Sequence, residues 1–410
     1  MSLRTPPRDS SAARRARAAV AALFFTNGAL FANILPRYPE IKEALGLDNA
    51  AYGFTVIAFP AGAIASGLAA GWIIRWSGSA RAAVLGTVVT AAGVLAAGLS
   101  PTLVLFVVAL FLAGAADAIT DVAQNAHGLR VQREMGRSIL NSFHAVWSIG
   151  AVTGGAMAAA AIALRLPLGI HLAVSGALFV TLALVAFRFT LPGRDPENVA
   201  VAPLDPDAAP ARRGPSARIW MMLAALVLIA TAGTTVEDAG FSWAALYLRG
   251  DLDAAPALAA AGLIALVGAQ FVGRLIGDPL VDRFGQRTVA IAGGLVLAIG
   301  MGAALLFPSV PGTIAGFAAA GLGVATLVPA AMAGADALPG LRHGTGLAIV
   351  SWLMRLGFLL SPPLVGLVSD GIGLRGALVI MPIMGVLVLL LSGVLPARQG
   401  RRQASADDPD

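Results

Sequence analysis

Long apolar segments are the feature that most limits how this chain can fold. Twelve segments follow one another, each of about the 20 residues that an α-helix needs to cross the hydrocarbon core of a bilayer. They are expected at residues 18–37, 51–74, 82–100, 103–128, 139–163, 168–189, 219–247, 257–277, 288–307, 312–335, 345–369 and 374–395. Only 12% of the 410 residues are charged, whereas soluble domains carry roughly 25%. The sequence therefore predicts an all-α membrane protein with twelve transmembrane helices.

Lysine and arginine are shared unequally between the connecting segments. If the N-terminus is cytoplasmic, 22 of these 28 residues lie on the cytoplasmic side and five on the other, with Arg355 inside the eleventh segment. The five are Arg37, Lys42, Arg165, Arg249 and Arg375. Basic residues concentrate on the cytoplasmic side of membrane proteins, so both termini are predicted to be cytoplasmic. No cleavage site follows the basic N-terminal flank, so the first segment is interpreted as an uncleaved helix.

A polar stretch divides the chain into two halves of six segments. Residues 191–218 are rich in proline, alanine and charge and lack an apolar face, which is typical of a flexible linker. The expected organisation is a cytoplasmic tail at 1–17, a six-helix bundle at 18–190, the linker at 191–218, a second bundle at 219–395 and a cytoplasmic tail at 396–410. Two parallel halves are one known architecture of secondary transporters.

Two kinds of residue inside the segments bear on helix packing. The pairs Gly62/Ser66, Gly67/Gly71 and Gly150/Gly154 have a spacing that lets helix backbones approach closely. Prolines within segments free backbone carbonyls, which need another partner at membrane depth. These are Pro60, Pro329, Pro362, Pro363 and Pro382.

The fourth segment carries a stripe of polar residues at membrane depth. Asp117, Asp121, Gln124 and Asn125 are three, four or seven residues apart, so they share one face of a helix. A carboxylate at this depth costs about 2.5–3.5 kcal/mol on insertion scales. The stripe is therefore expected to face protein or a water-filled cavity. Asp117 and Asp121 are candidates for a proton or substrate site, and a structural hydrogen-bonding role is the alternative.

Other candidates lie in four further segments. Glu237 and Asp238 in the seventh point about 100° apart, so at most one can face a central cavity squarely. Asn27 in the first is a candidate hydrogen-bond donor, and His144 in the fifth has a pKa suited to proton relay, although a helix contact is the alternative. Arg355 lies deep in the eleventh, either as a counter-ion for an acidic solute or carboxylate or as one half of a fixed pair.

Several function classes are disfavoured by what the sequence lacks. There is no cysteine, the four histidines have no paired spacing, and no phosphate-binding loop, dinucleotide fingerprint or metalloprotease motif is present. No cofactor or metal is expected, an enzyme is disfavoured, and the net charge of +6 is read as membrane orientation rather than nucleic-acid binding. The expected partners are a small solute, protons and the lipid bilayer, and the protein is expected to be a monomer.

The stretch GDPLVDRFGQR resembles the signature loop of the major facilitator superfamily. Gly277, Asp282, Arg283, Gly285 and Arg287 occupy its characteristic positions between segments eight and nine. We call these residues the latch, because the Asp282 carboxylate can accept hydrogen bonds from the N-terminal amides of a helix in the other half and so hold the two halves together. The equivalent first-half stretch, Gly71 to Arg81, lacks the aspartate.

Residues 121–155, 237–249 and 45–53 are similar to the MosC/YbjJ-like branch of that superfamily, whose members are bacterial inner-membrane proteins. This resemblance implies a transporter without naming its cargo. With the two halves it predicts a secondary transporter that moves a small solute by alternating access, and the intramembrane carboxylates indicate proton coupling through Asp117 or Glu237. Efflux of drugs or metabolites and uptake of a sugar-like solute both stay open. A membrane receptor without transport is the less favoured alternative. The fifth segment lacks the Gly-Pro usual in antiporters, which weakens the efflux interpretation.

Overall fold

The computed structural model describes residues 11–135, 139–193, 216–339, 341 and 345–397, and every regular element in these ranges is a helix. Among them, eleven helical segments are long and apolar enough to cross a membrane, and a shorter apolar helix covers Ile380–Val394. The prediction of an all-α membrane protein is confirmed. Most of the predicted linker and both predicted tails lie outside the described residues, so the domain boundaries stay a prediction.

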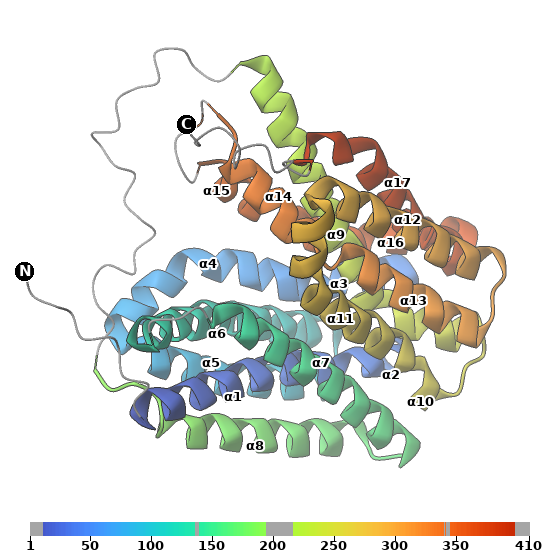
Figure 1. Ribbon diagram of the computed structural model, residues 1–410. Coiled ribbons are helices and arrows are strands. Elements are labelled where there is room, and N and C mark those ends of the chain that lie inside the picture. The colour runs from blue at the N-terminus through green and yellow to red at the C-terminus, as the bar shows by residue number, and fades with distance from the viewer. Residues whose placement is uncertain (1–10, 136–138, 194–215, 340, 342–344, 398–410) are drawn as a thin grey trace, which may run out of the picture. The chain divides into compact units, whose positions relative to one another are not determined.

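The described residues of the first half of the sequence form nine helical elements (Figure 1). Their bounds are α1 (Ser11–Ile34), η1 (Leu35–Arg37), α2 (Tyr38–Ala44), α3 (Asn49–Val56), α4 (Ala58–Ser77), α5 (Ser79–Gly98), α6 (Leu103–Met135), α7 (Leu140–Ala163) and α8 (Leu168–Phe187).

In the second half, the residues that the structure describes form ten elements. They are α9 (Ala217–Gly250), α10 (Pro256–Ala259), α11 (Ala261–Phe284), α12 (Gln286–Leu306), α13 (Val310–Val324), α14 (Leu327–Asp336), α15 (Thr345–Leu353), α16 (Arg355–Ala377), α17 (Ile380–Leu391) and η3 (Ser392–Val394). Gly373 inside α16 has a φ of 80° and is not helical.

Prolines explain two of the breaks within predicted segments. A proline removes one hydrogen bond and crowds the carbonyl four residues before it. Pro60 acts in this way on Val56, where α3 ends, and Pro329 acts on Ala325, between α13 and α14. The break between α15 and α16 at Met354 has no proline four residues later, so it requires another cause.

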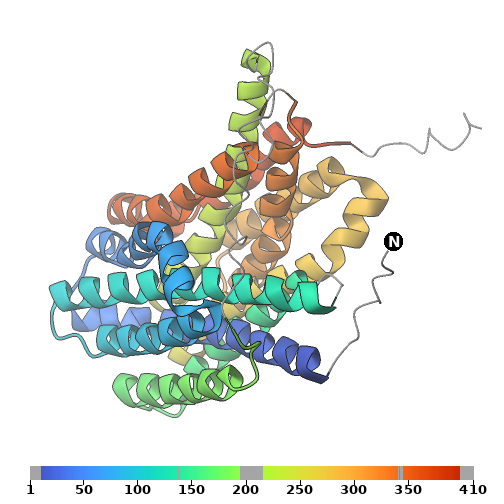
Figure 2. The same cartoon turned by 90° about the vertical axis from the view of Figure 1, so that its left-hand side faces the viewer.

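Contacts divide the chain into two compact units that do not follow the sequence halves. Unit 1 comprises Met1–Ala209, Phe241–Gly268 and Pro362–Ala377, and unit 2 comprises Pro210–Gly240, Ala269–Ser361 and Leu378–Asp410. In unit 1, α1 packs on α7 and α8, and α6 packs on α4 and α5 (Figures 1 and 2). In unit 2, α12 packs on α13 and α17, and α14 packs on α15.

Small residues line the tightest helix contacts of unit 1. A Cβ at Gly150 or Gly154 would collide with backbone of α1, and a Cβ at Gly62 would collide with the Phe111 carbonyl of α6. Gly67, in contrast, has no atom of another residue near its missing Cβ. Two of the three small-residue pairs therefore mark helix contacts.

Candidate functional site

Asp117 is joined to two other helices of unit 1 by a chain of hydrogen bonds. Asn27 of α1 donates from Nδ2 to Oδ1 of Asp117 in α6 over 2.6 Å, and Trp147 of α7 donates from Nε1 to Oδ1 of Asn27 over 2.8 Å. Asn27 is 5% exposed, whereas Asp117 and Trp147 are half-buried. Three residues from three helices thus form one polar cluster, which we call the Asp117 cluster.

The donor chemistry fixes the orientation of the Asn27 side-chain amide in this cluster. An indole N–H can only donate, so the Asn27 oxygen must face Trp147 and the Asn27 amide nitrogen must face Asp117. The amide therefore presents a donor to the carboxyl group of Asp117, which accepts through Oδ1. The partner is neutral, so the carboxyl group can gain or lose a proton without breaking an ion pair.

Close packing of α1 on α7 holds the cluster in place. Gly28 follows Asn27 directly, and a Cβ there would collide with the backbone carbonyl of Trp147. Gly150, three residues after Trp147, is similarly crowded by the carbonyl of Phe25. The two backbones can approach because both positions are glycine. This approach brings the indole within reach of the amide.

The other members of the polar stripe on α6 contact one another. Asn125 donates from Nδ2 to Oδ1 of Asp121 over 3.0 Å, and Gln124 donates from Nε2 to the same oxygen over 3.4 Å. Asp121 is exposed, whereas Gln124 is fully buried and its Oε1 has no hydrogen-bond partner among the described residues. The stripe therefore holds two environments: Asp117 accepts a hydrogen bond from Asn27 of α1, whereas Asp121 accepts from residues of its own helix.

The histidines occupy different surroundings. His144 is exposed, and its ring lies edge-on to Phe24 at a centroid distance of 5.2 Å. His127, which sequence reasoning did not single out, is fully buried between the Ser79 hydroxyl, 2.8 Å from Nδ1, and the Leu191 amide, which donates to Nε2 over 3.1 Å. No cluster of three potential metal ligands occurs among the described residues.

The acidic pair on α9 in unit 2 is less well satisfied. Asp238 is 7% exposed, and its Oδ2 has no hydrogen-bond partner among the described residues. The Ser361 hydroxyl hydrogen-bonds to its carboxylate but also lies 3.3 Å from the Thr235 carbonyl, so one hydrogen serves two acceptors. Glu237 is half-buried and has no ion pair or hydrogen bond with the described residues. Gln270 of α11 is also buried, with no partner for Oε1 in the same ranges.

Arg355 begins α16 at the break after α15. Thr234 of α9 donates its hydroxyl hydrogen to the Met354 carbonyl over 2.8 Å, and the Gly357 amide donates to the same carbonyl over 3.0 Å. A side chain inserted in this way is a common cause of a helix break without proline. Arg355 itself is exposed and forms no ion pair or hydrogen bond with the described residues. The fixed structural pair considered for it does not occur among these residues.

The predicted latch forms the tight turn between α11 and α12. Gly285 has a φ of 84°, which glycine tolerates, and a Cβ at Gly277 would lie 2.7 Å from Cγ2 of Thr326. Asp282 is exposed and has no ion pair or hydrogen bond with the described residues. Arg283 lies over the ring of Phe284 at 5.2 Å. The Arg287 amide donates to the Pro396 carbonyl. Because Asp282 has no partner among the described residues, its role as a latch stays a prediction.

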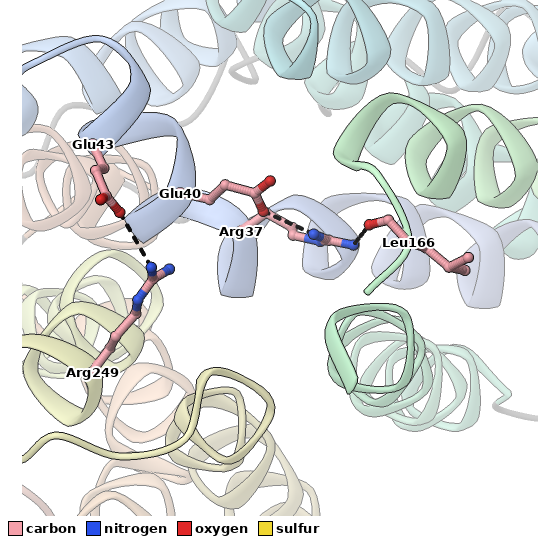
Figure 3. A network of polar contacts seen from close by, with 5 residues as sticks. All are labelled: Arg37, Glu40, Glu43, Leu166 and Arg249. Carbon is pink, nitrogen blue, oxygen red and sulfur yellow. Dashed lines mark hydrogen bonds and ion pairs between the residues drawn. The ribbon is translucent and has the colours of Figure 1, made fainter. Parts of the chain in front are cut away.

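At one end of unit 1, charged side chains join segments that are far apart in sequence (Figure 3). Arg37 pairs with Glu40 at 2.8 Å and donates to the Leu166 carbonyl over 2.9 Å, while Arg249 pairs with Glu43 at 3.2 Å. Arg37 is 4% exposed, so its pair is screened less than the exposed pair of Arg249. Arg37 and Arg249, which the charge count assigned to the non-cytoplasmic side, thus each pair with a glutamate of α2.

A second set of contacts at this end joins α3 to α9 and α16. The Asp370 carboxylate accepts from the backbone amides of Asn49 and Ala50 at 3.2 and 3.0 Å, which satisfies two orphan donors at the N-terminus of α3. Tyr52 donates its hydroxyl hydrogen to the Ser242 carbonyl over 2.7 Å. We call these contacts, with the Glu43–Arg249 pair, the end contacts.

Comparisons with known proteins identify the family of this chain. The family model of the Major Facilitator Superfamily matches residues 20–278 and 239–409. The uncharacterized transporter y4wD of Sinorhizobium fredii is 30% identical over 92% of this chain and 97% of its own length. Membrane protein MosC of Rhizobium meliloti is 28% identical over 91% and 88% of the two chains.

Among solved structures, a mutant form of the nucleoside transporter NupG is similar in fold. The TM-score is 0.73 at 13% sequence identity, and the match covers 92% of this chain and 98% of that one. The similarity to MosC and to uncharacterized relatives supports the MosC-like branch. The chain belongs to the Major Facilitator Superfamily.

Proposed function

We propose that this protein is a secondary transporter that moves a small solute across the bacterial inner membrane by alternating access, coupled to protons through Asp117. The observation that carries the proposal is the hydrogen bond between Asp117 and Asn27, which places a carboxyl group with a neutral partner inside a transmembrane segment. Ionisable residues within such segments typically mark ion or proton pathways.

The surroundings of Asp117 suit proton exchange. A carboxylate held by arginine or lysine stays ionised, because protonation would leave the cation unpaired. Asp117 has no such cation within salt-bridge distance among the described residues, and its contact is with an amide. It is also half-buried rather than sealed, which gives protons a route to it. Glu237 is the alternative coupling residue and has no comparable partner.

The end contacts support alternating access. Asp370 and Ser242 come from the second half of the sequence, whereas Asn49 and Tyr52 come from the first, and all four lie in unit 1. For a solute to pass between the halves from this end, these bonds must break. The Tyr52 hydrogen bond and the exposed ion pair are each worth about 0.2–1.5 kcal/mol, and each of the two bonds to the Asp370 carboxylate is worth about 1.5–3 kcal/mol. Such contacts are weak enough to open and close repeatedly.

The proposal is tested with full-length protein in proteoliposomes that contain a pH-sensitive dye. An inward proton gradient should drive transport of at least one solute from a panel of sugars, organic acids and amphipathic drugs. Asp117→Asn should lower gradient-driven transport to the level of empty liposomes, because the amide cannot carry a proton. The new amide oxygen can still accept from Asn27, so folding should persist.

Asp121→Asn is the matched control, since Asp121 lies one helical turn away on the same stripe, is exposed, and accepts hydrogen bonds from Gln124 and Asn125 of its own helix. It should retain most of the gradient-driven transport. Unchanged pH-dependent transport in Asp117→Asn would refute the proton role. Right-side-out and inside-out vesicles, compared in the same assay, decide between uptake and efflux.

A further inference from the structure

We propose that the transported solute carries an anionic group, a carboxylate or phosphate, and that Arg355 binds it. This inference rests on the proposed transport function and adds the chemical class of the cargo. It begins from the depth of Arg355. Along α16, Asp370 lies 15 residues further on, and a helix rises about 22 Å over that distance. Both residues belong to the candidate transmembrane span Thr345–Ala377, in which Arg355 is preceded by ten residues and followed by 22.

The face of α16 that carries Arg355 lies opposite its large exposed apolar residues. The large exposed apolar residues of the first turns of α16 are Leu360, Leu364 and Leu367, at 56%, 48% and 54% exposure, and they form one stripe. At about 100° per residue, Arg355 points roughly 120–180° away from that stripe. It shares its face with Pro362 and Gly366, seven and eleven residues later, and both are buried.

Arg355 is nevertheless exposed and has no ion pair or hydrogen bond with the described residues. A guanidinium group cannot lose its proton in a protein, so the positive charge persists at this depth. Such a charge is expensive within a membrane unless water or a counter-charge reaches it. An exposed cation within a transmembrane span, opposite the large apolar residues of its helix, is therefore suited to bind an anion that arrives and leaves.

The local backbone adds to the positive potential. The break at Met354 makes Arg355 the first residue of α16, and the N-terminus of a helix carries about half a positive charge. The freed carbonyl, which would repel an anion, is engaged by the Thr234 hydroxyl and the Gly357 amide. Discontinuous helices whose N-terminal ends point at anionic groups are a known device of transporter sites. Arg355 supplies planar donors that match carboxylate or phosphate oxygens.

The experiment uses purified full-length protein in detergent and measures thermal stability against acids and their neutral counterparts. The pairs are glucuronate with glucose, lactate with propane-1,2-diol, and phenylacetate with 2-phenylethanol, and inorganic phosphate and phosphatidylglycerol are added as separate arms. At least one soluble acid should raise the midpoint of unfolding, and its neutral counterpart should not. In Arg355→Gln the Kd for that acid should rise at least about tenfold, since hydrogen bonds to charged groups are lost.

Two further variants complete the test. Arg355→Lys keeps the charge without the planar donors, so it should bind the acid with intermediate affinity. Arg218→Gln removes an exposed arginine at the start of α9 and should bind as the wild type does. If Arg355→Gln does not fold, the reduced affinity of Arg355→Lys decides the matter.

The inference is overturned if no soluble acid stabilises the protein, if only phosphatidylglycerol does, or if stabilisation persists in the Arg355 variants. Transport of a neutral solute that depends on Asp117 but not on Arg355 would also overturn it, while the proposed transport function would stand. The other possible outcome is that an acid binds at Arg355 but no solute is transported. In that case the anion site would stand and the transport proposal would fail.

Discussion

Asp117 and Asp238 are both carboxylates within transmembrane segments, yet their surroundings differ. Asp117 in α6 accepts a 2.6 Å hydrogen bond from Asn27, whose orientation is fixed in turn by Trp147. Asp238 in α9 is buried, leaves Oδ2 without a partner among the described residues, and shares the Ser361 hydrogen with the Thr235 carbonyl. One carboxylate is held in a fixed geometry, and the other is only partly satisfied.

This difference suggests a division of labour between the two units. A fixed neutral donor keeps Asp117 in one position through repeated protonation, as a proton carrier requires. The polar groups of unit 2, including the exposed Arg355 and the half-satisfied Asp238, lack such fixed partners, which suits a solute that must enter and leave. Unpaired buried groups are costly, so the part of the molecule that binds a transient partner should contribute less to stability.

The largest expected change in stability follows from removing the centre of the Asp117 cluster. Asn27→Leu leaves the carboxyl group of Asp117 and the indole N–H of Trp147 without their partners. Each group left unpaired costs on the order of 1–3 kcal/mol of unfolding free energy. The measurement is unfolding in mixed micelles, with Trp147→Phe as the comparison variant, because it removes one bond and leaves the Asn27–Asp117 bond intact.

Asn27→Leu should therefore destabilise the protein about twice as much as Trp147→Phe does, if the costs of unpaired groups add. Equal losses would mean that the Asn27–Asp117 bond contributes little and that Asp117 is not held as described. Asn27→Leu should also shift the pH dependence of transport, because the donor to Asp117 is gone.

A smaller effect of the opposite sign is expected at Asp238. Asp238→Asn removes a buried carboxylate that lacks a partner for one oxygen, so the unfolding free energy should stay the same or rise by up to about 1 kcal/mol. The same unfolding assay, with Asp117→Asn measured beside it, checks this. A loss of more than about 2 kcal/mol would show that Asp238 has a strong partner and would remove the contrast with Asp117.

The sequence alone was informative about which residues matter and less so about what they contact. Apolar length and helical spacing identified the transmembrane segments and the polar stripe around Asp117, because both depend on local periodicity. Five prolines were recognised as freeing backbone carbonyls, and breaks lie four residues before two of them, Pro60 and Pro329. The other three lie inside α16 and α17. The twelfth segment was expected at full length, whereas the apolar helix there covers Ile380–Val394.

Long-range partners were beyond the reach of local pattern. Asn27 and Asp117 are 90 residues apart, and Asn49 and Asp370 are 321 apart. The break at Met354 depends on a hydroxyl from Thr234, 120 residues earlier. Asn27 and Arg355 were recognised as candidates by their polarity, but nothing in their spacing distinguished a residue with fixed partners from one without.

The smallest expected change in stability concerns Asp251, which lies just beyond α9, outside the transmembrane segments. It is a further carboxyl group whose burial and hydrogen bonding can be compared with those of Asp117 and Asp238. Burial raises the pKa of Asp251 above its ordinary value, and a hydrogen bond from the Arg375 backbone opposes the shift without cancelling it. Tyr247 and Arg375 are its titratable and charged neighbours. One backbone N–H thus fails to offset the burial of this carboxyl group.

The pH dependence follows from the direction of that shift. The folded state binds the proton more tightly than the unfolded state, so Asp251 stabilises the protein at a pH below its unfolded pKa of about 3.9. This contribution is lost as the pH rises through the higher folded pKa. Between the unfolded and the folded pKa of Asp251, the thermal midpoint of the wild type should therefore fall relative to that of Asp251→Asn as the pH rises. Asp253→Asn, two residues away, should follow the wild type. Parallel curves for wild type and Asp251→Asn would show that a partly buried carboxylate with one hydrogen bond carries no cost in the folded state, and the effect expected for Asp238→Asn would then lose its physical basis.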